Sequence, residues 1–241
     1  MSTQPDPETQ HTINLGGVPL EEVESFKYLG SSFTATGQAK DEINGRIGLA
    51  RSAFARLKSA LWSRREISLK TKGRIYEALI RTILLYGCET WPVRAEDLRR
   101  LEVFDNDCLR CLLRCCRRDC VPCAPLCQRC SLRALPSVLL QRRLRWFGHA
   151  SRRAPGEIIR EVICPTPQPT WRKRRGGQLK TWSRTIQEDL ALLGGPRVYG
   201  LRRWNREWPS ICIELAQDRR AWSAIVRDAV NALEAGPFRP G

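Results

Sequence analysis

The chain has 241 residues, of which 42% are hydrophobic, enough to bury one sizeable core or two small ones. Its 41 lysines and arginines exceed its 25 acidic residues by 16, a surplus that indicates a partner rich in negative charge, most often nucleic acid. The composition excludes collagenous and wholly disordered classes, and an anionic membrane surface is the weaker interpretation of the charge. No apolar run reaches the roughly 18 to 20 residues that cross a bilayer.

The N-terminal segment predicts a polar tail followed by short strands. Residues 1–11 are polar and proline-bearing, which favours disorder. Apolar and polar residues then alternate over 13–20 around the pair Gly16–Gly17, which is typical of a tight β-hairpin. A third extended run is predicted at 26–33. Together the strands in 12–35 would form one edge of a sheet on the helices, or the end of a sheet whose remainder is missing.

Residues 36–118 predict a bundle of three helices. The first carries an apolar stripe at steps of three and four residues, namely Ile43, Ile47, Ala50, Phe54, Leu57 and Leu61. The second begins after the N-cap candidate Ser68, ends at Gly87 and is expected to be buried over most of its girth, with Leu79 and Tyr86 on its apolar face. The third runs from Ala95 to about Arg114.

The second half predicts a separate helical unit. A Cys-rich loop at 119–135 leads to an Arg-rich helix at 136–155, which Pro136 suits as a first-turn residue. A basic linker at 156–180 precedes C-terminal helices at 181–235, and 236–241 is a tail. The fold class is therefore mainly α, with a short N-terminal β-hairpin or small sheet, a helical bundle and a second helical unit joined by Cys-rich and basic loops.

Eleven cysteines in a chain without a signal-peptide pattern indicate free thiols or metal ligands in a reducing, intracellular compartment, either nucleus or cytoplasm. Two C-x-x-C pairs, Cys120 with Cys123 and Cys127 with Cys130, could together hold one zinc ion. Only three residues separate the pairs, where zinc modules commonly place a dozen or more, so a loop of free thiols is the favoured interpretation, with disulfides as a further alternative, and no cofactor is required.

Basic residues recur at positions suited to phosphate contacts. On the first helix, Arg46, Arg51, Arg56 and Lys58 lie off the apolar stripe, where they are either ordinary solvated charges or phosphate contacts. In the second half, the basic candidates are Arg142, Arg143, Arg145, Arg152, Arg153, Arg172, Lys173, Arg174, Arg175 and Lys180, and Trp171 is a candidate to stack on an unpaired base. The run at 171–175 is alternatively a solvated linker or a nuclear address. His149 ends the Arg-rich helix and is expected to serve as a C-terminal dipole partner.

Four strings in order carry a family resemblance. They are F-K-Y-L-G-S at 26–31, D-E-I-N-G-R-I-G-L-A at 41–50, the run from T-K-G-R-I-Y to L-L-Y-G-C-E-T-W at 71–91, and L-R-R-L-E-V-F-D-N-D-C-L-R at 98–110. Together they resemble the region just after the polymerase palm in reverse transcriptases of non-LTR (LINE-type) retrotransposons. The resemblance implies that 12–35 is the end of the palm and 36–118 the thumb, which grips the primer–template duplex.

Three further strings are similar to motifs of the same family's C-terminal extension. They are L-R-W-F-G-H at 144–149, R-R-G-G-Q-L-K-T-W at 174–182 and D-R-R-A-W at 218–222. The Cys-rich segment departs from the family, whose relatives carry a charged connection there. The resemblance spans about residues 12–233, which correspond only to the back end of the family's protein.

The chemistry of that family requires paired aspartates on two divalent metals, and the sequence contains no Asp-Asp. Asp105 and Asp107 are expected to be solvated carboxylates on the polar side of the third helix. We therefore expect a protein that binds RNA, DNA or their hybrid with little sequence preference and does not copy it. A reverse transcriptase palm, in cis or in trans, is a further candidate partner. A zinc-dependent nucleic-acid adaptor and a functionless product of a truncated element are the alternatives.

Overall fold

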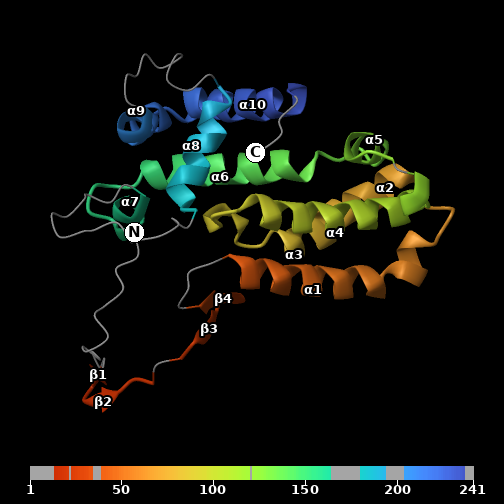
Figure 1. Ribbon diagram of the computed structural model, residues 1–241, viewed down its shortest axis with the longest axis horizontal. Coiled ribbons are helices and arrows are strands. Elements are labelled where there is room, and N and C mark those ends of the chain that lie inside the picture. The colour runs from red at the N-terminus through yellow and green to blue at the C-terminus, as the bar shows by residue number, and fades with distance from the viewer. Residues whose placement is uncertain are drawn as a thin grey trace.

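The computed structural model describes residues 14–21, 23–34, 39–119, 121–163, 180–193 and 204–236. Within them the fold is mainly α with two short N-terminal hairpins, as the sequence predicts (Figure 1). None of the helices in these ranges combines the length and the hydrophobicity needed to cross a membrane.

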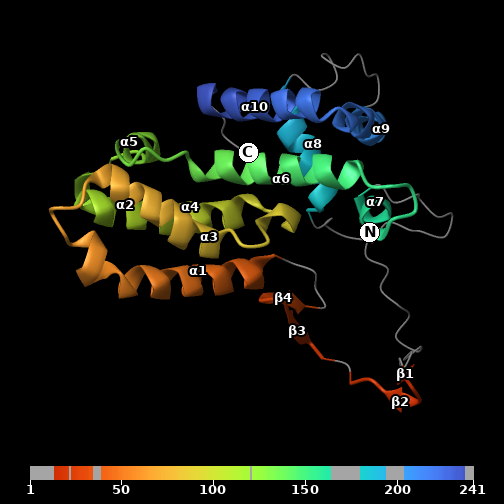
Figure 2. The same cartoon turned by 180° about the vertical axis from the view of Figure 1, so that it is seen from behind.

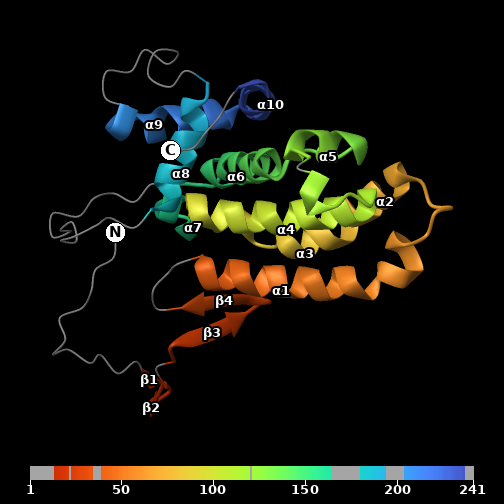
Figure 3. The ribbon, with the colours of Figure 1, turned by 45° about the vertical axis from the view of Figure 1, so that its right-hand side comes forward.

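The N-terminal strands form two separate antiparallel hairpins. β1 (Asn14–Leu15) and β2 (Val18–Pro19) are joined by the two glycines at positive φ, which confirms the predicted turn. The single extended run expected at 26–33 is wrong: β3 (Ser25–Tyr28) and β4 (Ser31–Thr34) fold back on each other, because Leu29 and Gly30 both take positive φ (Figure 3).

The first unit is the predicted bundle of helices. Its elements are α1 (Lys40–Arg56), η1 (Lys58–Trp62), α2 (Leu69–Ile75), η2 (Tyr76–Arg81), α3 (Thr82–Leu84), η3 (Cys88–Thr90) and α4 (Ala95–Leu113). α2, η2 and α3 run on as one helix. The Ser68 hydroxyl accepts a hydrogen bond from the Thr71 amide at 3.2 Å, and Gly87 ends the segment at a φ of 73°, so both predicted boundaries are confirmed.

The buried face of this helix differs from the predicted one, because its middle, η2, is a π-helix. Buried positions recur at steps of four along it, namely Lys72, Tyr76, Ile80 and Leu84, with Arg81 and Leu85 buried beside them. Hydrogen bonds of a π-turn span five residues, so each turn holds more residues than an α-turn and a step of four stays on one side. Leu79 and Tyr86, expected on the apolar face, are consequently exposed.

A buried ion pair joins this helix to α4. Asp105 is 1% exposed and accepts hydrogen bonds from Arg81 at 3.0 and 2.7 Å and from the Tyr76 hydroxyl at 2.8 Å. A third Arg81 nitrogen donates to the Arg133 carbonyl at 2.7 Å. The expectation that Asp105 is a solvated carboxylate is therefore wrong, because it neutralises an arginine that the helix packing buries. Asp107 lies nearer the surface, 3.6 Å from Arg110.

The second half adds η4 (Arg117–Asp119), α5 (Cys123–Arg129), α6 (Leu135–Ser151), α7 (Ile158–Ile163), α8 (Trp182–Ala191), α9 (Trp204–Gln217) and α10 (Arg219–Ala235). The predicted Cys-rich loop thus contains a short helix, α5, and the predicted linker contains α7. Seen from both sides, α6 lies between the helices of the first unit and α10 (Figures 1 and 2). Its start contributes Leu135 and Leu139 to the first core, and its remainder contributes Leu144 and Phe147 to the second.

The second core is built on a close contact between α6 and α10. Gly148 of α6 faces Trp222 of α10, and a Cβ at this glycine would lie 2.2 Å from Trp222 Nε1. That nitrogen donates to the Leu144 carbonyl at 2.8 Å, and the Trp222 and Phe147 ring centroids are 5.3 Å apart. The L-R-W-F-G-H string therefore positions α10, and Trp222 is a core residue as predicted.

We expect Asp105→Asn to lower the free energy of unfolding by about 3–5 kcal/mol, because the neutral amide leaves the buried Arg81 charge unpaired. Asp107→Asn is the matched control, two residues further along α4 at a partly exposed pair, and should cost less than about 1 kcal/mol. Urea unfolding followed by circular dichroism measures both changes. Equal changes in the two variants would contradict the structural role of Asp105.

We expect Gly148→Ala to destabilise the fold by about 1–3 kcal/mol, because the added methyl group overlaps the Trp222 ring. The matched control is Gly48→Ala in α1, where no atom lies within 4 Å of the new Cβ. That variant should gain about 0.5–1 kcal/mol, because alanine is the better helix former. A Gly148→Ala protein as stable as the parent would show that the packing of α10 on α6 does not depend on the close contact between Trp222 and Gly148.

Candidate nucleic-acid interface

Two adjoining cavities form a groove between α6 and α10. Their volumes are about 330 and 290 Å³, and Arg145, Ser223 and Val226 line both of them. The arginines along the groove are Arg133, Arg145, Arg152, Arg219 and Arg227, and His149 lies among them. We call this surface the α6–α10 groove. No aspartate or glutamate is among the described residues that line the two cavities.

Helical spacing explains why the cations gather there. Arg145, His149 and Arg152 follow one another at steps of four and three, which places them on one face of α6. Arg219 and Arg227 are eight residues apart on α10, with Ser223 midway, so they also share a face. Because the apolar residues beside them hold the two helices together, both cationic faces border the same groove.

The groove brings like charges together. Partial burial and the positive charge of Arg219 lower the pKa of the Arg152 guanidinium. The Arg152 side chain also donates a hydrogen bond to the Ala216 carbonyl at 2.8 Å, which fixes it at the end of α6. A bound anion would relieve the repulsion between Arg152 and Arg219, so the arrangement favours negatively charged ligands.

Of the basic residues predicted to bind nucleic acid, Arg145 and Arg152 line this groove. Arg51, Arg56 and Lys58 are exposed on α1 and η1 and make no ion pair within the described residues. None of the three is among the residues that line the groove, and we refer to them together as the second basic surface. Arg153 is exposed beside the groove, where it lies 3.8 Å from Glu157 and 3.4 Å from His149 Nε2.

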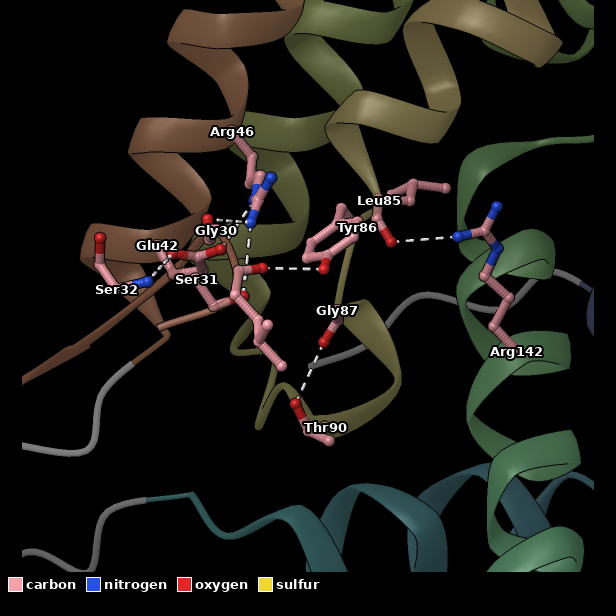
Figure 4. Close-up of polar contacts among 11 residues, drawn as sticks. Gly30, Ser31, Ser32, Glu42, Arg46, Leu85, Tyr86, Gly87, Thr90 and Arg142 are labelled. Atoms are coloured by element: carbon pink, nitrogen blue, oxygen red, sulfur yellow. Dashed lines mark hydrogen bonds and ion pairs between the residues drawn. The ribbon is translucent and has the colours of Figure 1, made fainter. Parts of the chain in front are cut away.

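The prediction that Arg46 is a surface cation is wrong. Its side chain is buried, pairs with Glu42 at 2.7 Å and donates to the Gly30 carbonyl (Figure 4). The guanidinium also lies over the Tyr86 ring, 4.4 Å from its centroid. Glu42 in turn accepts a hydrogen bond from the Ser32 amide at 2.7 Å. Arg46 therefore anchors the β3–β4 turn to α1, and it is not available to a phosphate.

Arg143 was also predicted to be exposed, and this too is wrong. It is buried and makes a bidentate pair with Asp189 of α8, at 2.7 and 2.9 Å. Burial raises the pKa of the Asp189 carboxyl, an effect that the Arg143 charge opposes. Arg142 is half-buried and donates to the Leu85 carbonyl at 3.0 Å (Figure 4). These two arginines connect α6 to α8 and to the first unit.

Two further predictions concern the basic linker. Trp171, Arg172, Lys173, Arg174 and Arg175 lie outside the described residues. Lys180 pairs with Glu188 at 2.7 Å and is half-buried, so it supports the start of α8. In the same region the Trp182 indole donates to the Glu89 carbonyl at 2.7 Å, which joins the second unit to η3.

The cysteines do not assemble into a metal centre within the described residues, where no group of three or more potential ligands is placed to hold an ion. Cys120 lies outside those residues. Cys123 and Cys127 approach each other, with 3.7 Å between their sulfurs, and a hydrogen bond from the Cys127 thiol lowers the pKa of Cys123. Cys130 is buried beyond the end of α5. Burial raises the pKa of Cys108 to about 12, in keeping with its predicted place in the core.

Sequence reasoning missed three arginines of the groove, namely Arg133, Arg219 and Arg227. The last two could have been found, because they flank the apolar stripe of the C-terminal helix at a spacing of two turns. Arg133 lies before α6, where no periodicity marks it. Only the fold brings it to the groove.

Comparison of the chain with models of protein families, with curated proteins and with solved structures finds no match.

Proposed function

We propose that the protein binds nucleic acid through phosphate contacts, with little preference for base sequence. The α6–α10 groove carries this proposal, because arginines line both of its walls and no carboxylate lies among its described lining residues. Guanidinium groups match phosphate oxygens in charge and in hydrogen-bond geometry. The net charge of +16 supports the same class of partner.

The second basic surface extends the proposal. Arg51, Arg56 and Lys58 are exposed and unpaired in the described part of the chain, so they are free to contact the backbone of a duplex. The buried positions of Arg46 and Arg143 remove these two residues from the predicted contacts. Little sequence preference is expected, because phosphate contacts position a nucleic acid without reading its bases.

We further propose that the chain derives from the thumb and C-terminal extension of a non-LTR retrotransposon reverse transcriptase. The order and spacing of the motif strings support this origin. The proposed activity is binding without copying, since the paired aspartates of the polymerase are absent from the sequence and Asp105 is committed to Arg81 and Tyr76. A palm in cis or in trans remains a proposed partner. No observation favours the zinc-dependent adaptor.

The experiment that tests the proposal measures binding of labelled 20-nucleotide RNA and DNA by fluorescence polarisation at several salt concentrations. If six or more phosphates are contacted, affinity should fall about a thousandfold between 50 and 200 mM salt. Oligonucleotides of unrelated sequence should bind within about threefold of one another, since the contacts are to phosphates. An affinity that changes less than tenfold over this salt range would contradict the proposal.

A further inference from the structure

The shape of the α6–α10 groove limits the form of nucleic acid that can enter it. Its two helices pack directly on each other, because Gly148 admits the Trp222 ring and Trp222 bonds to the Leu144 carbonyl. Helices in such contact have axes about 8–10 Å apart. A duplex is wider than this spacing. Its own major groove, about 12 Å wide, admits a single helix. A duplex could therefore touch only the rims of the α6–α10 groove.

The length of the groove suits a chain of phosphates better than a single anion. Arg145 and Arg152 are seven residues apart, or about 10 Å along α6. Arg219 and Arg227 are eight residues apart, or about 12 Å along α10. Cations thus stand on both walls over a distance longer than one phosphate group. A polyanion lying along the groove would meet arginines from both sides at successive positions.

The floor of the groove differs from that of a site that binds bases. Val226 and Val230 lie at its base, and the Trp222 ring is only 3% exposed, so it offers no free face for stacking. Ser223 and Asn231 add small polar groups between the arginines. The recognition chemistry is therefore that of a sugar–phosphate backbone.

We infer that the α6–α10 groove holds the backbone of one unpaired strand of RNA or DNA and excludes duplexes from its interior. This inference rests on the proposed function and narrows it to a form of nucleic acid and a site. The two basic surfaces then bind different forms of nucleic acid. The groove binds the single strand, and the exposed cations of α1 and η1 remain accessible to a duplex.

The test compares a 20-nucleotide single strand with a hairpin duplex of equal phosphate number. The groove variant is Arg145→Gln with Arg227→Gln, two exposed positions on opposite walls. The matched control is Lys70→Gln with Arg74→Gln, two exposed cations one turn apart on α2 that remove the same charge. Circular dichroism melting curves of both variants should overlay that of the parent protein.

The groove variant should bind the single strand at least about tenfold more weakly, and the slope of log affinity against log salt should decrease by about 1.4, the value for two lost phosphate contacts on a single strand. Its affinity for the duplex should change no more than that of the control. Equal losses for strand and duplex, or a groove variant that behaves like the control, would overturn the inference and leave the proposed function standing. If the parent protein binds neither nucleic acid, the proposed function itself fails.

Discussion

The approach of α10 to α6 at Gly148 is the constraint on which the second half of the structure depends. Without a Cβ at that position, the Trp222 ring reaches the backbone of α6 and its indole nitrogen finds a carbonyl. The Phe147 ring packs against Trp222, and Trp208 and Trp182 join the same aromatic cluster. The α6–α10 groove exists because this contact sets two cationic helix faces side by side.

Arginine performs two different tasks in this protein, and burial separates them. Arg46, Arg81 and Arg143 are buried, and each is paired with a carboxylate. Arg46 and Arg81 also donate hydrogen bonds to backbone carbonyls. Such residues fix the relative positions of helices, because an unpaired buried charge is costly. Arg145 and Arg227 remain at the surface, where Arg227 makes only an exposed pair with Asp228 at 3.8 Å that a ligand phosphate can replace. Buried arginines thus hold the helices in place, whereas exposed arginines are proposed to bind the ligand.

Helical periodicity was sufficient to predict most of the fold. The apolar stripe of α1, the N-cap at Ser68 and the stop at Gly87 are local signals, and the structure bears out all three. The β3–β4 turn was missed, because Leu29 is an unusual residue at positive φ and its conformation is held by contacts to α1 and Tyr86. The π-helix at η2 also gave no signal, so the predicted buried face of that segment was partly wrong.

The candidate site was less predictable than the fold. A sequence shows that an arginine lies off the apolar stripe, but only tertiary packing decides whether a neighbouring helix covers it. Asp189 lies 46 residues beyond Arg143, and no spacing rule connects them. Arg145 differs from Arg143 by two positions and points away from α8 to the groove. Periodicity therefore located the cationic helix, whereas the assignment of each arginine required the fold.

The continuity of α6 has a consequence for how the chain can vary in length. Because one uninterrupted helix supplies Leu139 to one core and Leu144 to the other, an extra residue between them would turn one end by about 100° relative to the other. Neither leucine could then be buried without displacing the opposite half. Insertions should be tolerated in the segments before and after α6. The number of residues within α6 is fixed, because both cores depend on it.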